Sequence, residues 1–182
     1  MRIVTERLIL RHPILKDAAD IVQNANDLAV SRYTARVPFP YHIKHAINFI
    51  KYCRSQERQK PIKNLEFVIE HRAQKKAIGF AGFVRIDHYT GKADIGYWLG
   101  RNYWRQGLGT EATNALIKYA FTKLKLQRLE AAICKENLAS QALVRKLEFR
   151  KEGVRRRAGR SLATGKWHDA VIYGLLKEKQ GK

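Results

Sequence analysis

Two glycines two residues apart, Gly107 and Gly109, stand between a β-rich stretch and a stretch with helical periodicity. Because glycine has no Cβ atom, a bulky anion can approach the backbone closely at such positions. The first turn of a helix also carries N–H groups without intrahelical partners, and its dipole favours negative charge. These residue types at this spacing predict an anion site built from backbone amides at the start of a helix at Leu108.

Two common phosphate-binding loops do not fit this stretch. The P-loop requires Lys and then Ser or Thr directly after its glycines, whereas Thr110 and Glu111 follow here. The dinucleotide-binding fingerprint tolerates Ala112 at its third glycine position, but it requires an early βαβ unit. The residues before Gly107 show the period-two pattern of an antiparallel meander, so a Rossmann domain is excluded.

The elements that must position this loop follow from hydrophobic periodicity. The pattern predicts strands and helices in the order β, α, α, β, β, β, α, β, α, β, β, over residues 7–13, 15–26, 43–59, 65–71, 77–87, 93–100, 108–124, 128–134, 138–147, 149–157 and 168–176. A meander that runs into a strand–helix–strand crossover places helices on both faces of a mixed sheet. We therefore expect one domain over residues 1–182, of the α/β (α+β) class, with about seven mostly antiparallel strands and about four helices.

Charge is the unusual feature of the composition. Thirty-six Lys and Arg residues against sixteen Asp and Glu residues give a formal net charge of +20. Such a charge attracts anions and promotes weak binding to nucleic acid, but it does not determine a fold. The charge is explained equally well by a solvated basic surface and by a surface that binds a polyanion.

The cysteines and the apolar segments set further limits. Cys53 and Cys134 have no His or Cys neighbours at ligand spacing, which argues against a disulfide framework and a zinc site and favours a reducing cytoplasm. We expect no bound metal. No window is apolar over the length of a membrane span, so no membrane association is expected.

The loop from Trp104 to Gly109 resembles the [QR]-x-x-G-x-[GA] loop of the GNAT superfamily, which contains acetyl-coenzyme A (acetyl-CoA)-dependent N-acetyltransferases. Trp104 replaces the first Gln or Arg, as in the Rim-type ribosomal-protein N-terminal (alanine/serine) acetyltransferases and their relatives. The strings TERLILRHP, ADIGYWLGRNYWRQGLGTEA and ENLASQALVRKLEFRKEG are similar to the same branch. The resemblance covers nearly the whole chain and implies a GNAT fold. Glu148 departs from it, because the family usually has Gly there.

The resemblance also implies which residues bind the co-substrate. Backbone N–H groups of the loop would bind the pyrophosphate of acetyl-CoA, and Asn137 would bind its pantetheine arm. The implied set is Trp98, Leu99, Arg105, Gln106, Gly107, Leu108, Gly109, Thr110 and Asn137.

Acetyl transfer from a thioester to an amine needs a route for the amine proton, stabilisation of an oxyanion, and an acid near the sulfur. In many GNAT enzymes the acid is a Tyr at the position of Val144, which cannot donate a proton. The Rim-type branch has its proposed acid at the position of Ser140, so the resemblance implies Ser140 as the acid. Asn137 and Ser140 also suit a structural role in the first turn of a helix.

The base is less well defined by the sequence. Asp94, on the strand before the loop, lies where relatives often carry a Glu that takes the proton through water, but it could equally pair with a nearby cation. His88, His168 and Glu66 are further candidates without a rank. Glu111 suits the first turn of the helix that follows the loop, where the dipole favours an acid.

The acceptor is predicted from amine chemistry and charge. At pH 7 an α-amine is roughly a tenth neutral and a Lys amine about 0.04% neutral, a difference of roughly 3 kcal/mol, so a site without a strong base favours an α-amine. Residues 149–160 contain six cations and one acid. Contact with ribosomal RNA or an acidic peptide explains this cluster, and so does a solvated hairpin. We therefore expect the N-terminus of a ribosomal protein as acceptor. An acetyltransferase for a small amine or antibiotic, and a non-catalytic ribosome- or nucleic-acid-binding module, are the alternatives.

Overall fold

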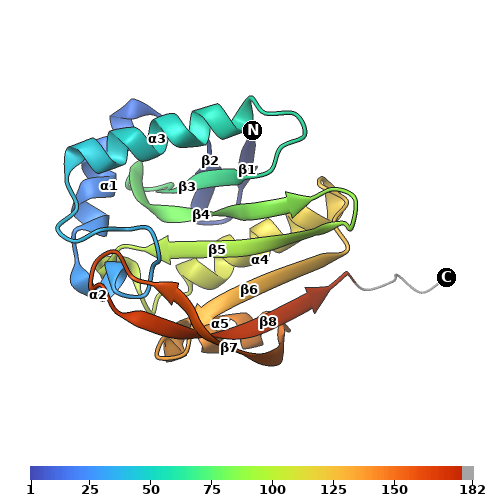
Figure 1. Cartoon of the computed structure of the whole chain (residues 1–182). Helices are drawn as coiled ribbons and strands as arrows, with labels where there is room; N and C mark the ends of the chain where they lie inside the picture. The colour runs from blue at the N-terminus through green and yellow to red at the C-terminus, as the bar shows by residue number, and fades with distance from the viewer. Residues whose placement is uncertain (178–182) are drawn as a thin grey trace.

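The chain folds around one eight-stranded sheet, seen in a computed structural model that describes residues 1–177 (Figure 1). The strand order is β1-β2-β3-β4-β5-β6-β8-β7. The strands are β1 (Arg2–Val4), β2 (Leu8–Arg11), β3 (Leu65–His71), β4 (Lys76–Asp87), β5 (Lys92–Leu99), β6 (Arg128–Cys134), β7 (Arg150–Arg160) and β8 (Trp167–Leu176). The α-helices in this part of the chain are α1 (Ala18–Ala25), α2 (Leu28–Ser31), α3 (Ile43–Glu57), α4 (Leu108–Thr122) and α5 (Leu138–Lys146).

The predicted mixed and mostly antiparallel sheet is confirmed, since within residues 1–177 only the β5–β6 pair is parallel. The structure adds one strand and one helix to the expected numbers. The added strand is β1, which precedes the expected strand at residues 7–13 and joins β2 through a turn in which the N–H group of Thr5 donates to the carbonyl of Leu8 at 2.9 Å. The short helix α2 begins where the side chain of Asp27 accepts from the N–H of Ala29 at 2.7 Å.

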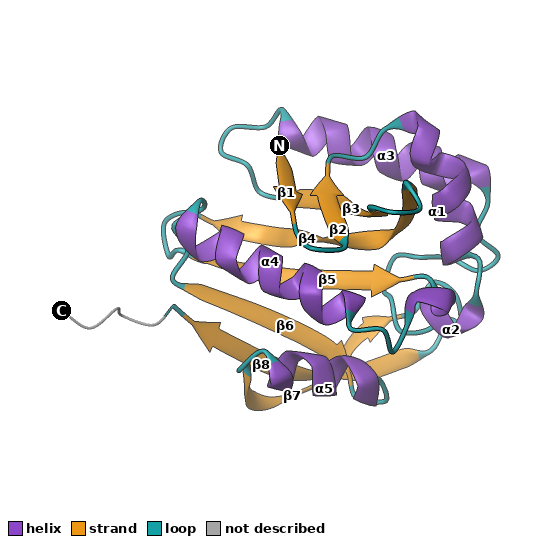
Figure 2. Ribbon diagram, turned by 180° about the vertical axis from the view of Figure 1, so that it is seen from behind, coloured by secondary structure: helices purple, strands orange, loops and turns teal. Residues whose placement is uncertain are grey.

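Helices cover both faces of the sheet, as predicted. Helices α4 and α5 pack on one face (Figure 2), where Leu108, Leu116 and Val144 join a large core cluster. Helices α1 and α3 pack on the other face, where Ile21 and Ile50 join a second cluster. No helix within residues 1–177 is both long enough and apolar enough to cross a membrane.

The parallel strands β5 and β6 separate partway along their length, as Figure 1 shows. Their register covers three pairs only and ends where Asp94 lies opposite Glu130. Beyond that point β5 continues beside β4, up to Leu99, and β6 continues beside β8, up to Cys134. The separation opens the middle of the sheet between the two helix layers, and this opening positions the site.

The turn after α5 contains a residue with an unfavourable backbone conformation. Glu148 has φ of 67°, and a Cβ atom is disfavoured in this left-handed region, which is why glycine often follows a helix. We expect Glu148→Gly to raise the free energy of unfolding by about 0.5–1 kcal/mol, measured by urea denaturation. Ala142→Gly, at an exposed position inside α5, should lower it by about 1 kcal/mol. If the Glu148→Gly variant is no more stable than the unmodified protein, Glu148 does not strain the turn.

Candidate active site

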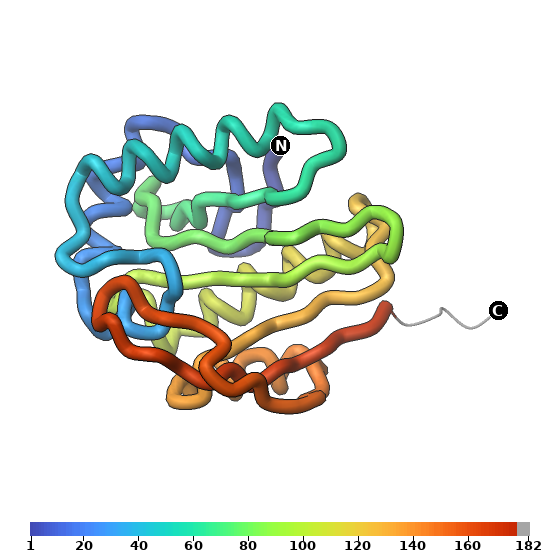
Figure 3. The backbone as a smooth tube through the Cα atoms, in the orientation of Figure 1, coloured from blue at the N-terminus to red at the C-terminus, as the bar shows by residue number. Residues whose placement is uncertain are grey.

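A pocket of about 960 Å³ lies where β5 and β6 separate. Its walls come from the segment between α2 and α3, from α3, from the strands β3 to β6, from the start of α5 and from the β7–β8 connection. Figure 3 shows the segment between α2 and α3 beside the β7–β8 connection, which contributes Leu162 to the wall. Segments far apart in the sequence therefore enclose one site.

The loop before α4 has the geometry of an anion cradle. Arg105 and Gly107 both have positive φ, 58° and 78°, and such alternation turns successive N–H groups toward one side. No side chain caps α4. Glu111 is the first residue whose N–H bonds back to the loop, to the carbonyl of Gly107 at 3.0 Å. Within residues 1–177 the N–H groups of Leu108 and Thr110 therefore have no protein acceptor, as an anion site requires.

Three contacts that the sequence did not predict hold this loop in place. Glu111 accepts from the hydroxyl of Thr5 at 2.6 Å and from Nε of Arg7 at 2.7 Å. The guanidinium of Arg7 also donates to the carbonyl of Gln106 at 2.9 Å. Burial raises the pKa of Glu111, but the hydrogen bonds from Thr5 and Arg7 outweigh this, and the pKa lies below its usual value. The β1–β2 turn thus fixes the first turn of α4.

The predicted co-substrate residues fall into two groups. Those from Arg105 to Thr110 form the loop and the first turn of α4, with Leu108 buried beneath them. Trp98 and Leu99 lie at the end of β5, where the carbonyl of Leu99 accepts from the indole N–H of Trp104 at 2.7 Å. The ring of Trp98 packs against Phe80 and lines the pocket. The contacts of both groups with acetyl-CoA stay predictions.

Asn137 and Ser140 meet at the start of α5, next to the pocket. The side-chain oxygen of Asn137 accepts from the N–H of Ser140 at 3.2 Å, so Asn137 caps the helix. The hydroxyl of Ser140 lies 2.8 Å from the hydroxyl of Tyr97 on β5. Burial raises the pKa of Tyr97 to about 12, while the hydrogen bond with Ser140 acts in the opposite direction. Val144, in contrast, is fully buried. The site therefore has a pair of hydroxyl groups, of which the sequence indicated only one.

Two carboxyl groups line the pocket, Asp94 and Glu66. Asp94 forms an ion pair with Arg85 of β4. Burial raises the pKa of Glu66 to about 7, although the positive charge of Arg36 opposes this. The exposed His88 contacts the carbonyl of Ile62 at 2.9 Å and does not line the pocket. Of these three candidate bases, Asp94 is ion-paired, Glu66 is partly buried in the pocket and His88 lies outside it.

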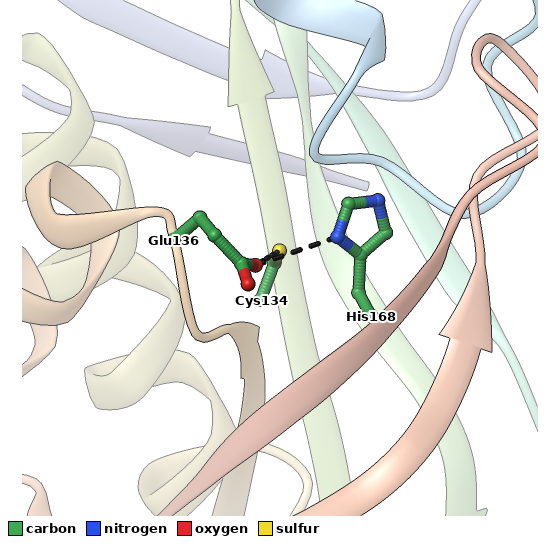
Figure 4. A group of neighbouring side chains, drawn as sticks. All are labelled: Cys134, Glu136 and His168. Atoms are coloured by element: carbon green, nitrogen blue, oxygen red, sulfur yellow. Dashed lines mark hydrogen bonds and ion pairs between the residues drawn. The ribbon is translucent and has the colours of Figure 1, made fainter.

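A third cluster borders the pocket at Cys134 and brings together Cys134, Glu136 and His168 (Figure 4). One oxygen of Glu136 accepts from the thiol of Cys134 at 2.7 Å and lies 3.4 Å from Nδ1 of His168. Burial and the hydrogen bond to Glu136 raise the pKa of Cys134 to about 11, so the thiol is protonated at neutral pH.

Sequence spacing missed this group, because the β6–β8 pairing brings His168 beside Cys134 from 34 positions along the chain. The three ligand atoms lie within 4.8 Å of one another, a spacing at which such groups can hold an ion. The expectation that the chain binds no metal therefore stays a prediction.

Comparison with known proteins gives consistent matches. The sequence profile described as an Acetyltransferase (GNAT) domain matches residues 7–150. The uncharacterized N-acetyltransferase p20 of Bacillus licheniformis is 35% identical over 175 residues, which cover 96% of each chain. A Vibrio cholerae structure, provisionally assigned as a ribosomal-protein-serine acetyltransferase, is 28% identical with a TM-score of 0.84 over 97% of this chain and 98% of its own. The microcin C7 self-immunity acetyltransferase MccE, in complex with acetyl-CoA and AMP, is 28% identical with a TM-score of 0.82 over 95% and 94%.

Proposed function

The chain belongs to the GNAT acetyltransferases, and from that premise we propose that it transfers the acetyl group of acetyl-CoA to the N-terminal α-amine of a ribosomal protein. The general activity, acetyl-CoA-dependent N-acetylation, is that of the family. The acceptor and the roles of individual residues are the proposal. Because the proposed acceptor is made on ribosomes, we place the activity in the cytoplasm.

The cradle before α4 suits the diphosphate of acetyl-CoA. The N–H groups of Leu108, Gly109 and Thr110 supply donors, and Gly107 leaves the approach open because it has no Cβ atom. Asn137 uses its side-chain oxygen for Ser140, which leaves its amide nitrogen to donate to the pantetheine arm. Trp98 and Leu99 lie at the end of β5, beside the opening through which the arm would reach the pocket.

Acetyl-CoA supplies the thioester, and the chain supplies the acid and base. Ser140 donates its hydroxyl proton to the departing sulfur, and Tyr97, hydrogen-bonded to Ser140, orients that hydroxyl. Asp94 was the predicted base. Its carboxylate forms an ion pair with Arg85, so this cation would compete with an acceptor ammonium for the same oxygens.

The position of the basic strand supports the ribosomal acceptor most directly. The connection between β7 and β8 contributes Leu162 to the pocket, and β7 carries exposed cations along its length. A surface of ribosomal RNA bound to β7 would therefore present a neighbouring protein N-terminus to the pocket. The provisional assignment of the Vibrio cholerae relative supports the same acceptor.

Small amines are the second candidate acceptors, favoured by the likeness to the spermidine N(1)-acetyltransferase of Escherichia coli. Thiol release from acetyl-CoA, measured with ribosomal N-terminal peptides and with polyamines and aminoglycosides, separates the two. We expect the peptides to give the highest kcat/KM. A higher kcat/KM for a small amine would show that this amine, and not a ribosomal protein, is the acceptor.

Reversing charge on β7 should weaken ribosome binding without affecting the chemistry. The guanidinium groups of Arg156 and Arg157 are exposed and have no carboxylate partner within residues 1–177, whereas that of Arg155 lies 3.8 Å from Glu130. The backbone N–H of Arg157 donates to Asp169 at 2.9 Å, a contact that the side-chain change leaves in place. In the double variant Arg156→Glu/Arg157→Glu we expect about tenfold weaker co-sedimentation with ribosomes at low salt, because fewer phosphate contacts release fewer counterions. Turnover on a free peptide should stay within about twofold.

The control variant is Lys123→Glu/Lys125→Glu, which makes the same charge change on exposed residues between α4 and β6. It should retain co-sedimentation. If both variants lose ribosome binding equally, the net charge of the protein and not the β7 surface causes the binding. If neither variant loses ribosome binding, the proposal that β7 docks on the ribosome is wrong.

A further inference from the structure

Three residues in register across β3, β4 and β5 leave an open row on the acceptor side of the sheet. Glu66 pairs with Gly82, and Gly82 pairs with Gly96. Residues that pair across neighbouring strands present their side chains on the same face. In the next row of that face Phe80 and Trp98 fill the space with their rings. The two glycines therefore leave a gap beside Glu66.

The carboxylate of Glu66 occupies part of this gap. A Cβ atom at Gly82 would lie 2.7 Å from Oε2 of Glu66, so the side chain lies over β4 where only glycine fits. A Cβ atom at Gly96 would meet nothing within 4 Å. Glu66, Gly82 and Gly96 line the same pocket as Ser140 and its partner Tyr97. The open end of the row therefore lies in the pocket that contains the proposed acid.

Glu66 has no hydrogen-bond or ion-pair partner within residues 1–177, although the chain carries a net charge of +20. Other partly buried acids are paired, as Glu70 is with Arg11 and Glu111 with Arg7. Arg36 and Cys53 interact electrostatically with Glu66. The other charged and titratable residues that line the pocket are Tyr33, Tyr41, His45, Tyr52, Arg85, Asp94, Tyr97 and Cys134. An unpaired carboxylate in a pocket costs solvation unless a ligand compensates.

We propose that Glu66 is the catalytic residue that binds the acceptor's ammonium group and takes its proton. This inference rests on the proposed acetyl transfer, and it applies to either class of acceptor. Aromatic side chains line the rest of the wall, among them Phe49 and Tyr52, and they suit an acceptor with one positive charge and an apolar body.

The proton balance is complete without another reactant. The carboxylate of Glu66 takes one proton from the ammonium and releases it to solvent. The neutral amine attacks the thioester carbonyl, so that a C–N bond forms and the C–S bond breaks. The thiolate takes the proton of the Ser140 hydroxyl, and the second proton lost by the nitrogen restores that hydroxyl. Because burial raises the pKa of Glu66 to about 7, it matches an α-amine with a pKa of about 8.

The test is the pH dependence of kcat/KM for the best amine of the panel. We expect Glu66→Gln to lower kcat/KM about 100-fold at pH 7. The loss should shrink as pH rises toward 9.5, because the amine is then neutral without help. KM for acetyl-CoA should not change, and Glu66→Asp should recover part of the rate.

Two variants serve as comparisons. Any loss of kcat/KM in Asp94→Asn should not become smaller as pH rises. Glu70 lies on the same strand as Glu66 but is paired with Arg11, so Glu70→Gln should keep full activity. If Glu66→Gln keeps half or more of the rate at pH 7, or if Asp94→Asn shows the pH-dependent loss instead, the inference is overturned. A wild-type protein that acetylates no amine overturns this inference together with the proposed function.

Stability gives a readout that does not depend on turnover. With a raised pKa, the native carboxyl retains a proton that the unfolded chain releases, so its contribution to stability falls as pH rises through about 7. Glutamine does not titrate. Glu66→Gln should therefore unfold at a higher urea concentration than the wild type at pH 8, and by a smaller margin at pH 5. An equal difference at both pH values would show that Glu66 is not a protonatable group of the pocket.

Discussion

Replacing Gly107 with valine is expected to weaken acetyl-CoA binding about 100-fold, a loss of about 3 kcal/mol. Gly107 has φ of 78° at the residue that precedes α4. A β-branched side chain in this region costs of order 1–3 kcal/mol, so the loop would change conformation and the N–H groups of Leu108 and Thr110 would turn away from a common centre. A new Cβ atom would also lie 3.4 Å from the guanidinium of Arg7, which holds the loop.

Titration calorimetry with acetyl-CoA measures this effect, and circular dichroism checks that the variant is folded. Gly153→Val is a matched control, because a Cβ atom there meets nothing within 4 Å and the backbone of Gly153 has no positive φ. The control should bind acetyl-CoA like the wild type. If Gly107→Val also binds normally, the loop does not hold the co-substrate.

Replacing Ser140 with alanine is expected to lower kcat about 100-fold near pH 7, with KM for acetyl-CoA unchanged. The hydroxyl of Ser140 lies 2.8 Å from that of Tyr97, and the change to alanine removes the proposed proton donor to the departing sulfur. The backbone N–H of Ser140 still bonds Asn137, so the helix start should survive the change. Ser140→Thr, which keeps a hydroxyl, should retain most of the rate.

A double-mutant cycle separates the two hydroxyl groups. If Tyr97 acts by orienting Ser140, Tyr97→Phe should lower kcat by itself but add little to Ser140→Ala. A Ser140→Ala variant within about twofold of the wild type, combined with a large loss in Tyr97→Phe, would assign the acid to Tyr97. Additive losses would contradict a common role.

Local patterns in the sequence predicted most of the elements. The expected strands at 65–71 and 128–134 agree with β3 and β6 to the residue, and α4 begins at Leu108 as the glycine loop indicated. Period-two alternation and helix-start residues depend on neighbours within a few positions, so one sequence contains this information. Strand β1, which precedes the expected strand at residues 7–13, was not predicted, because the turn after it is held by contacts of Thr5 and Arg7 with Glu111, more than 100 residues away.

The site was only partly predictable for the same physical reason. The family pattern indicated Ser140 and the loop, but the partner of Ser140 is Tyr97 on a strand 43 residues earlier. Glu66 gained importance only when the register placed it over Gly82. The group of Cys134 and His168 depends on the β6–β8 pairing. Strand register joins distant residues, and periodicity alone does not determine it.

The most direct test of the central claim follows the backbone amides of the loop by NMR during two titrations. Acetyl-CoA carries the diphosphate, whereas S-acetylpantetheine carries the same thioester without it. If the loop binds the diphosphate, the amide signals of Leu108, Gly109 and Thr110 should shift with acetyl-CoA and stay in place with S-acetylpantetheine. Equal shifts with both ligands, or none with acetyl-CoA, would contradict the account.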